Sequence, residues 1–368
     1  MTLLAGTGSL MTAALMIGGS MLGTNAAAPG DDPGGAPRYG GEHTAYRWVD
    51  SPTGSDARLR GLSAVSREVA WASGTGGTVL RTTDGGRSWE SVGPAGTEAL
   101  QFRDIEATSA QHAVALSIGE GEDSRVFVTD DGGRSWAESF RNTDARAFYD
   151  CMAFFDHRNG LAVSDPVDGQ FRLVRTRDGG HSWSPVDPAG MPSAEPGEFG
   201  FAASGTCLTT GPGHQAWLAT GGVNPARVFS SHDGGTTWSV TGTPVAGAEA
   251  GGIFSVRFRD ARRGVVVGGD FTDPTGASDN AAWTADGGRS WHPVAGRSPG
   301  GYRSGSAWVH GTHETALAVG PTGSDVSLDG GRSWTAFDTG SLDSVECAAD
   351  GACWGSGEHG RVARLSRG

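Results

Sequence analysis

The amino-acid sequence predicts an all-β fold, a seven-bladed β-propeller, from three observations. An octapeptide occurs six times at propeller-like intervals, 62 of the 368 residues are glycine, and the two ends of the chain resemble complementary parts of one further blade. A mainly helical fold does not fit this composition, because each glycine inside a helix costs about 1 kcal/mol relative to alanine. Short strands joined by tight turns accommodate the glycines.

The repeated octapeptide first occurs as TTDGGRSW at residues 82–89. Its third position is always aspartate, its last position is always tryptophan, and successive copies start 43 to 55 residues apart. The pattern [ST]-x-D-x-G-x-x-W is the Asp-box, also known as the BNR repeat. The six pairs are Asp84 and Trp89, Asp131 and Trp136, Asp178 and Trp183, Asp233 and Trp238, Asp286 and Trp291, and Asp329 and Trp334.

We expect the Asp-boxes to stabilise the fold and not to form an active site. The Gly-Gly pair permits the positive φ angles of a tight turn. The aspartate carboxylate can accept backbone N–H groups within that turn, and the preceding Ser or Thr caps its other side. The tryptophan is expected to turn into its blade and bury a large apolar area.

Each repeat contains four β-type runs, which in the first blade are residues 59–66, 69–74, 78–83 and 88–92. Residues 353–366 (CWGSGEHGRVARLS) resemble residues 70–83, the middle of that blade, and the chain ends where a seventh Asp-box would begin. Residues 45–51 (AYRWVDS) resemble a fourth strand. We therefore predict that the N-terminal strand joins the C-terminal blade and closes the ring.

The N-terminal 28 residues are apolar and end in an A-x-A site, which indicates a signal peptide, although no Arg or Lys precedes the apolar run. A membrane anchor is the alternative. Residues 29–43 are expected to be a flexible linker and residues 44–368 the propeller. The sequence thus predicts an exported protein, extracellular, periplasmic or at the cell wall, with no membrane span in its mature part.

The four cysteines fit an oxidising compartment. Cys347 and Cys353 flank the turn sequence AADGA, so we expect a disulfide between them. Cys151 and Cys207 lie near the starts of two consecutive repeats and could form a second one. Buried free thiols are the alternative for both pairs.

The face of the ring opposite the Asp-boxes, here termed the channel face, is where we expect function. It receives the loops that lead into each blade and those between second and third strands. Three arginines at equivalent blade positions could converge there on an anion, unless the polar groups only pair with one another and seal the channel. The candidate binding residues are Arg60, Arg103, Asp150, Asp165, Asp168, Ser204, Phe254, Asp270, Tyr302 and Arg303.

Motifs for catalysis or cofactors are not found. The sequence has no nucleophile elbow, HExxH motif, P-loop, dinucleotide fingerprint or haem motif, so no catalytic residue, cofactor or metal is assigned. Asp270, Asp273 and Asp279 were weighed as calcium ligands but lack the EF-hand spacing. The net charge of −13 argues against nucleic-acid binding.

Beyond the boxes, residues 149–180, 201–207, 252–258, 265–270 and 301–309 resemble exported bacterial BNR-repeat proteins related to the photosystem II assembly factors of the Ycf48 and Hcf136 type. The resemblance implies a non-catalytic assembly factor that binds protein partners. Some such relatives carry an oxidoreductase label, which no motif supports. We therefore expect a monomeric binding platform for a protein, or for a small anionic or carbohydrate ligand.

Sialidases are the other large Asp-box family that the sequence resembles, and a sialidase-like glycosidase is the alternative function. The resemblance implies an arginine triad, for which Arg60, Arg103 and Arg303 are candidates, and a tyrosine nucleophile, for which Tyr302 is near. The F/Y-R-I-P motif is absent, and no Tyr–Glu pair can be assigned.

Overall fold

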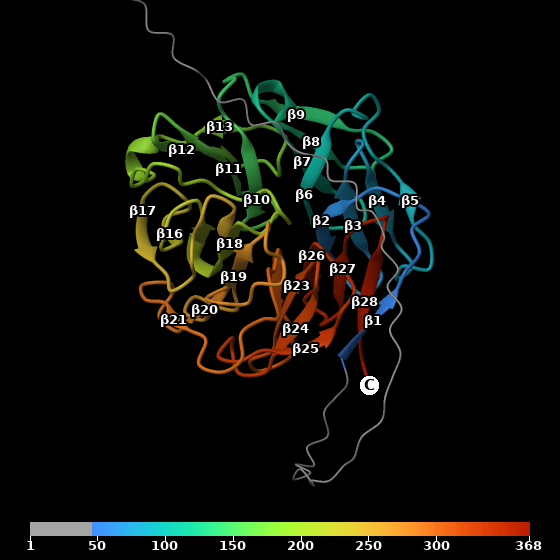
Figure 1. Ribbon diagram of the computed structural model, residues 1–368. Coiled ribbons are helices and arrows are strands. Elements are labelled where there is room, and N and C mark those ends of the chain that lie inside the picture. The colour runs from blue at the N-terminus through green and yellow to red at the C-terminus, as the bar shows by residue number, and fades with distance from the viewer. Residues whose placement is uncertain (1–45) are drawn as a thin grey trace, which may run out of the picture. The chain divides into compact units, whose positions relative to one another are not determined.

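The computed structural model describes residues 46–368, which form seven four-stranded sheets arranged around a ring (Figure 1). All strand pairings are antiparallel, and the predicted seven-bladed propeller is confirmed. The predicted signal peptide and linker lie outside the described residues. Within residues 46–368 the helical elements are three short 3-10 turns, η1 (Gly121–Asp123), η2 (Pro188–Gly190) and η3 (Pro212–His214).

Every blade places its strands in chain order from the channel outward, except the seventh, whose outermost strand is β1. The innermost strands are β2 (Leu59–Ala64), β6 (Gln101–Ala107), β10 (Tyr149–Phe154), β14 (Leu208–Gly211), β18 (Gly251–Phe258), β22 (Gly305–Trp308) and β26 (Ser344–Cys347). The second strands are β3 (Ala70–Gly74), β7 (Ala113–Ile118), β11 (Gly160–Val167), β15 (Gln215–Ala219), β19 (Gly264–Asp270), β23 (Ala316–Gly320) and β27 (Cys353–Ser356). The third strands are β4 (Val79–Thr82), β8 (Arg125–Thr129), β12 (Gln170–Thr176), β16 (Arg227–Ser231), β20 (Ala281–Thr284), β24 (Gly323–Ser327) and β28 (Val362–Arg367). The outermost strands are β5 (Glu90–Ser91), β9 (Ala137–Arg141), β13 (Ser184–Pro185), β17 (Trp238–Gly242), β21 (His292–Pro293), β25 (Thr335–Asp338) and β1 (Tyr46–Asp50).

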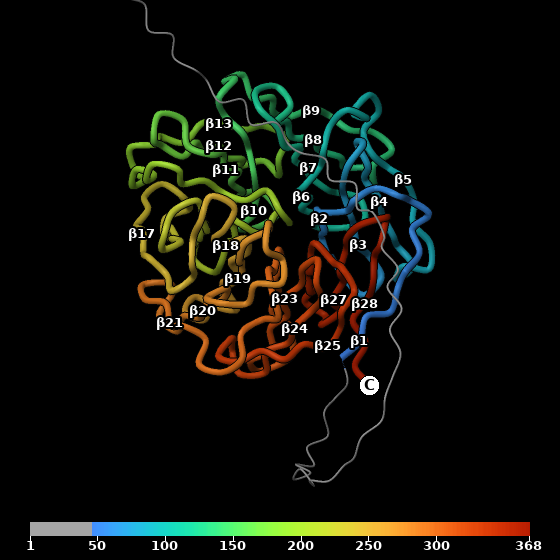
Figure 2. The backbone as a smooth tube through the Cα atoms, viewed as in Figure 1, coloured from blue at the N-terminus to red at the C-terminus, as the bar shows by residue number. Residues whose placement is uncertain are grey.

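The ring closes as the sequence predicts. Strand β1 pairs with β28, with Tyr46 opposite Arg367 and Asp50 opposite Ala363. Figure 2 shows the first described strand, in blue, beside the last strand, in red. The pairing covers the outer edge of β28, which would otherwise present unpaired backbone groups.

The Asp-boxes form tight turns between the third and fourth strands. In the first box Ser88 donates its N–H and its hydroxyl to the Asp84 carboxylate, at 3.0 and 2.6 Å, and Thr82 donates its hydroxyl to the same group at 2.9 Å. These hydrogen bonds lower the pKa of Asp84 to about 2. Gly85 and Gly86 have φ angles of 75° and 78°, which explains the Gly-Gly pair.

Each Asp-box tryptophan lies in the seam between its own blade and the preceding blade. This corrects the expectation that the ring turns into its own blade. Trp136 of the second blade, for example, packs edge-on against Trp71 of the first blade, with ring centroids 6.4 Å apart. The seam between the sixth and seventh blades has no box, and Trp48 of β1 packs there instead. The seven apolar clusters between neighbouring blades form most of the core.

Two disulfides cross-link the propeller. Cys151 in β10 is joined to Cys207 just before β14, with Cα atoms 6.0 Å apart. Cys347 and Cys353 are joined across the β26–β27 hairpin, with Cα atoms 4.0 Å apart.

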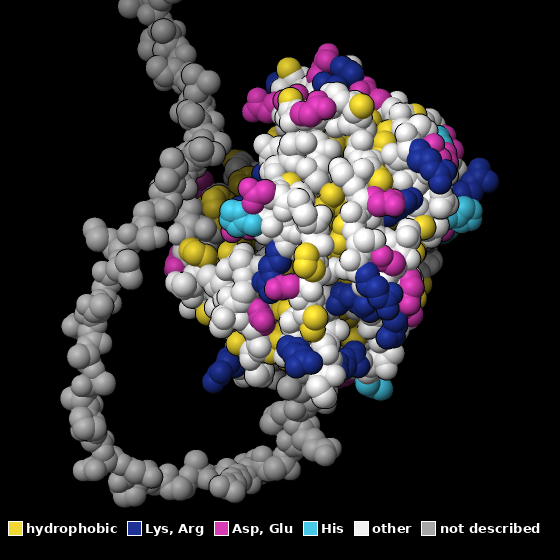
Figure 3. Space-filling view, turned by 90° about the vertical axis from the view of Figure 1, so that its right-hand side faces the viewer, with side chains coloured by type: hydrophobic (Ala, Val, Ile, Leu, Met, Phe, Trp, Pro, Cys, Tyr) yellow, Lys and Arg dark blue, Asp and Glu magenta, His cyan; other side chains and the backbone are white. Residues whose placement is uncertain are grey.

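The outer surface is chemically mixed. Figure 3 shows arginine and acidic side chains interspersed over one side of the ring, with hydrophobic side chains scattered among them. No helix in the described part of the chain is long and apolar enough to cross a membrane.

Candidate functional site

The segment Phe201–Thr206, which we term the plug segment, crosses the central channel before the chain enters β14. Arg103 of the second blade donates to the Ala202 carbonyl at 2.7 Å. The Ser204 hydroxyl donates to the Ser304 carbonyl, at the start of the sixth blade, also at 2.7 Å. Ser204, predicted to begin an inner strand, therefore lies in this crossing segment.

The plug segment is fixed at its C-terminal end. Gly205 has a φ angle of 72°, and a Cβ atom there would lie 2.4 Å from a carboxylate oxygen of Asp104, so only glycine fits. The Cys151–Cys207 disulfide ties the following residue to the third blade. The backbone of the segment thus forms part of a rigid channel mouth.

Three arginines gather at this mouth on the channel face, and we term Arg58, Arg60 and Arg103 the arginine cluster. Arg58 holds the buried carboxylate of Asp343 by two hydrogen bonds, of 2.7 and 2.8 Å, and also pairs with the more exposed Glu358 at 3.1 Å. The Nε atom of Arg60 lies 3.9 Å from the same Asp343 carboxylate. The buried carboxylate of Asp343 therefore faces both Arg58 and Arg60.

The electrostatics of the arginine cluster favour an incoming anion. Burial lowers the pKa of Arg103 to about 9, and the charges of Arg60 and Arg58 act in the same direction. Burial also lowers the pKa of Arg60, against the attraction of Asp343. Because a guanidinium stays protonated, these shifts express the free-energy cost of burying cations. The Nε atom of Arg60 is buried without a hydrogen-bond partner.

Asp150 and Asp165 form a carboxyl pair near Arg103. Burial, followed by the charge of Asp165, raises the pKa of Asp150, while Arg103 opposes that rise. Burial raises the pKa of Asp165 to about 6, although Gly200 donates its N–H to this carboxyl at 2.8 Å. Both carboxyls of the pair therefore release their protons at a higher pH than free aspartate.

An aromatic group adjoins the arginine cluster. Phe254 stacks on Phe201 of the plug segment, with ring centroids 3.7 Å apart, and meets Tyr302 edge-on at 4.6 Å. Tyr302 is 8% exposed, and burial raises its pKa. Phe271, which lies edge-on to Phe254, is 52% exposed and presents an apolar side chain to solvent.

A hollow of about 240 Å³ lies on the channel face of the fifth blade. Its lining includes Gly251, Gly269, Asp270 and Asp273. The Asp270 carboxylate accepts the backbone N–H and the hydroxyl of Thr272, at 2.8 and 2.5 Å, so it stabilises its own loop.

Arg303 does not join Arg60 and Arg103, which corrects the predicted set of three arginines. It is 1% exposed, its Nε donates to Asp325 at 2.7 Å, and its Nη1 donates to Thr322 at 2.9 Å. The physical reason is its position before β22 begins, whereas Arg60 lies within β2 and Arg103 within β6. Arg303 has a structural role.

Asp168 lies apart from the channel as well. It occupies the turn between β11 and β12 with a φ angle of 54°, and it pairs with Arg146 at 2.8 Å on the exposed surface. This turn joins a second and a third strand, so Asp168 lies on the channel face as predicted. Its ion pair with Arg146 is separate from the arginine cluster.

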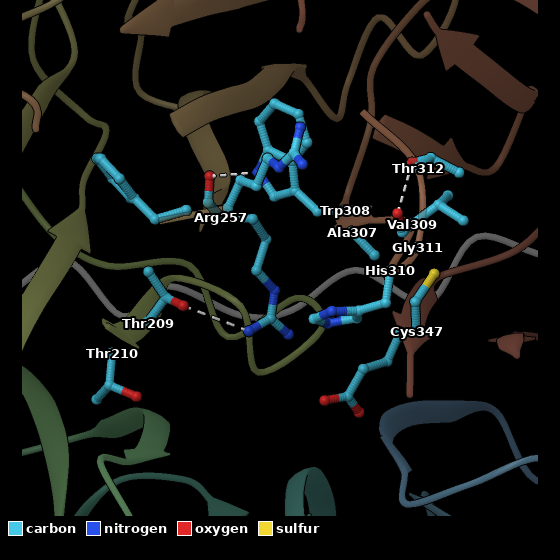
Figure 4. A pocket seen from close by; sticks show the side chains of 13 residues that line it. Thr209, Thr210, Arg257, Ala307, Trp308, Val309, His310, Gly311, Thr312 and Cys347 are labelled. Carbon is cyan, nitrogen blue, oxygen red and sulfur yellow. Dashed lines mark hydrogen bonds between the residues drawn. The ribbon is translucent and has the colours of Figure 1, made fainter. Parts of the chain in front are cut away.

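The Asp-box face carries a pocket that sequence reasoning missed. It has a volume of about 390 Å³ at the end of the inner strands β18, β22 and β26. Figure 4 shows the guanidinium of Arg257 extending between Thr209 and His310. Glu346 also lines the pocket and accepts the backbone N–H of Ala64 at 2.9 Å.

Acidic side chains lie near Arg257, in the part of the channel toward the Asp-box face. Burial raises the pKa values of Asp104, Glu106 and Glu346, and the charge of Arg257 opposes this rise in all three. Arginines thus gather at the channel-face mouth, whereas carboxyl groups surround Arg257 toward the Asp-box face. No sequence motif marks this arrangement, because its residues come from several blades.

Asp270, Asp273 and Asp279, weighed as calcium ligands, do not converge into a ligand group. Among residues 46–368, one set of at least three potential ligands does converge, and it consists of His112, Asp130 and His181 on the Asp-box face. These residues are far apart in the sequence, so their spacing gave no signal.

Arg58 and Asp343 are the main members of the mouth that the predicted site lacked. Arg58 precedes β2, and the β-bulge between Leu59 and Gly61 interrupts the alternation at Arg60, so the strand pattern gives no signal for Arg58. Asp343 directly precedes β26, outside the strand pattern as well.

The fold is similar to that of several solved propellers. YCF48 bound to a D1 peptide aligns with a TM-score of 0.61 and 16% identity, over 88% of this chain and 95% of that protein. YCF48 from Cyanidioschyzon merolae aligns with a TM-score of 0.59 and 16% identity, over 87% of this chain and 98% of that protein. At such identities the likeness shows the fold alone.

The GH74 enzyme of Niastella koreensis aligns with a TM-score of 0.61 and 12% identity, over 86% of this chain and 53% of the enzyme, so the chain spans about half of that enzyme. No protein-family model matches the chain, and no curated protein matches it. The comparisons therefore establish a β-propeller fold and leave the ligand to be argued from the site.

Proposed function

We propose that this propeller is a non-catalytic binding protein whose arginine cluster binds an anionic group of a protein partner. The observation that carries the proposal is the buried Nε of Arg60, which has no hydrogen-bond partner. The low pKa of Arg103, about 9, supports it, because a bound carboxylate would offset the cost of the buried cation. Charge pairing of this kind also selects among partners.

The surroundings of the arginine cluster favour a peptide segment over a small ion. The half-exposed Phe271 offers apolar contact. A hollow partly lined by Gly251 and Gly269 lets a main chain approach closely. Tyr302 links the two areas, since its Cα lies 3.1 Å from the Cβ position of Gly269 and its ring adjoins Phe254. One YCF48 structure of similar fold has a bound peptide, so peptide binding by this propeller is proposed by analogy with it.

A glycosidase is favoured less by the geometry. Arg303 is held by Asp325 and cannot complete a sialidase-type arginine triad with Arg60 and Arg103. Tyr302 is buried with a raised pKa, which opposes the formation of a nucleophilic phenolate. A carbohydrate as a bound ligand remains part of the expectation from sequence, with a carboxylated sugar as its anionic form.

The proposal is tested with short fluorescein-labelled acidic peptides and with counterparts in which glutamine replaces glutamate. Fluorescence anisotropy should show binding of acidic peptides that weakens about tenfold or more in R60M and R103M, because a buried charge loses its partner. Methionine preserves most of the packed volume. The control R134A removes an exposed arginine from the Asp-box face. Equal binding of acidic and neutral peptides, or equal loss in R134A, would contradict the proposal.

We also propose that the protein is exported and acts as a monomer. The apolar residues 1–28 and the two disulfides support export. N-terminal sequencing of the protein from the extracytoplasmic fraction should place cleavage after Ala28. Recovery of the protein with an intact N-terminus from the cytoplasm would contradict the proposed export.

A further inference from the structure

His112, Asp130 and His181 converge on the Asp-box face at the seam between the second and third blades. His112 Nδ1 lies 2.7 Å from one oxygen of Asp130, and His181 Nε2 lies 3.2 Å from the other. One ligand atom from each side chain lies within 4.8 Å of the other two. The side chains of His112, Asp130 and His181 are 18%, 60% and 46% exposed, so solvent can reach the group.

The backbone positions of the three residues are fixed by the blade architecture. His112 directly precedes β7, and its backbone N–H is held by the Ser109 hydroxyl at 3.0 Å. Asp130 and His181 belong to the Asp-box turns of the second and third blades. The ring of His112 lies against the third blade's box, with two of its atoms 3.6 Å from the Cβ position of Gly179. The group therefore bridges two blades whose own turns are rigid.

The carboxylates of the neighbouring Asp-box residues Asp131 and Asp178 are already engaged in hydrogen bonds within their own turns. Asp131 accepts the hydroxyl and N–H of Ser135, at 2.7 and 2.9 Å, and Asp178 accepts the same groups of Ser182. Asp130, in contrast, makes no contact within its box and is directed to the two histidines. This leaves one free carboxylate and two imidazoles as a separate ligand set.

The internal repeats show that these three residues are not required by the blade. In the first blade the positions of His112, Asp130 and the box histidine hold Val69, Thr83 and Arg87. Four of the six boxes carry arginine where the third blade carries His181. Three residues that the repeat pattern does not prescribe thus meet at one seam. A surface His–Asp pair contributes only about 0–1 kcal/mol, so ion pairing alone gives little reason for the arrangement.

We propose that His112, Asp130 and His181 form a divalent transition-metal site that links the second and third blades, with Zn²⁺ as the first candidate. Two imidazole nitrogens and one carboxylate oxygen are ligands that Zn²⁺ accepts, whereas Ca²⁺ and Mg²⁺ prefer oxygen ligands alone. In a tetrahedral site with bonds of about 2.0–2.1 Å the ligand atoms are roughly 3.4 Å apart. The histidine nitrogens lie 2.7 and 3.2 Å from different oxygens of Asp130, and one ligand atom of each residue lies within 4.8 Å of the other two, so binding of one ion requires a readjustment of these exposed side chains. A fourth position faces solvent.

The test is calorimetric titration of the untagged protein with Zn²⁺, since a histidine tag would bind the metal. We expect one Zn²⁺ per chain, and affinity reduced at least about tenfold in H112Q, D130N and H181Q, because even changes beside metal ligands cost about 10- to 100-fold. Asp130→Asn keeps the shape of the side chain. H232Q, which changes an exposed histidine in the fourth blade's box, is the matched control and should bind normally.

Two further readouts separate metal binding from folding. Co²⁺ should give visible d–d absorption with the native protein and not with D130N, and Zn²⁺ should raise the melting temperature of the native protein only. Circular dichroism verifies that each variant is folded. The proposal would be overturned if Zn²⁺ did not bind one-to-one. It would also be overturned if the variant that combines H112Q, D130N and H181Q bound Zn²⁺ with unchanged affinity. The metal site lies on the Asp-box face and the arginine cluster on the channel face. The peptide-binding experiment and the Zn²⁺ titration can therefore fail independently of each other.

Discussion

The Nε of Arg60 lies 3.9 Å from Asp343, beyond hydrogen-bonding distance, although the two side chains are neighbours. Arg58 donates two short hydrogen bonds to the same carboxylate. Two cations therefore compete for one buried anion, and Arg60 is left without a partner. This competition is the physical basis of the proposed binding of an external carboxylate at the channel mouth.

Asp343→Asn should strengthen anion binding and weaken the fold. Removal of the carboxylate that Arg58 holds leaves the arginine cluster more positive, so acidic peptides should bind about tenfold more tightly, equivalent to about 1.4 kcal/mol. The free energy of unfolding should fall by about 1–3 kcal/mol, because Arg58 loses its partner. Anisotropy and urea denaturation measure the two effects. E358Q, a change of the exposed partner of Arg58, should alter both much less, and weaker binding in D343N would contradict the argument.

Loss of the Cys151–Cys207 disulfide should destabilise the protein more than loss of Cys347–Cys353. The first closes a sequence separation of 56 residues and the second one of 6. The chain-entropy relation gives about 4 and about 2 kcal/mol for these separations. The variants C151S/C207S and C347S/C353S each replace one disulfide by two serines. Unfolding in denaturant measures the free energy of unfolding of each variant.

The same two variants test whether the plug segment positions Arg103. Because Arg103 is anchored on the Ala202 carbonyl, the C151S/C207S variant should also bind acidic peptides less tightly, and the C347S/C353S variant should not. Equal stability losses together with unchanged peptide binding would show that the plug segment is held without its disulfide.

The ring could be predicted from the sequence because it repeats. Asp84 and its five equivalents mark every turn at nearly constant spacing, and the resemblance of the two chain ends identified the seventh blade. Trp48 shows the limit of this reasoning. It fills the same type of seam as the box tryptophans, but no box surrounds it, so its role emerges only from the packing.

The mouth was predicted only in part, because its members depend on local strand position. Arg60 and Arg103 lie within their strands, whereas Arg303 precedes its strand and turns to Asp325. The plug segment has neither period-two alternation nor a turn motif that would reveal its path across the channel. His112, Asp130 and His181 come from different turns and meet only when neighbouring blades are packed.

Asp165 should make the protein less stable as the pH rises through about 6. Its folded pKa of about 6 exceeds the ordinary value of 3.8, so the folded state holds this proton more tightly than the unfolded state. The stabilisation is complete below about pH 4 and is lost as the pH rises through the folded value.

Asp165→Asn removes that dependence and should be more stable than the native protein at neutral pH, by about 1–3 kcal/mol. Urea denaturation at several pH values measures the difference. The control D168N changes an exposed carboxylate three residues further along the chain and should leave the pH profile unchanged. A native protein that gains stability between about pH 4 and 7 while D165N does not would contradict the assigned direction.

Trp48→Ala should open the joint between the chain ends. The side chain is 8% exposed, packs against Phe337 with ring centroids 6.1 Å apart, and donates its Nε1 hydrogen to Ser324 at 2.9 Å. Truncation of a buried tryptophan costs about 3–5 kcal/mol. Because this seam and the pairing with β28 hold β1 at the edge of the seventh blade, amide hydrogen exchange should accelerate in both strands more than in the third blade.

The neighbouring Val49 provides the matched control for Trp48, since it belongs to the same strand but is 49% exposed. Val49→Ala should change stability by no more than about 0.5 kcal/mol and leave exchange in β28 as it is. If Trp48→Ala lowered stability uniformly, with no preferential exchange in β1 and β28, the seam would be an ordinary part of the core. Preferential exchange would show that one tryptophan takes the place of the missing seventh Asp-box in holding the ring closed.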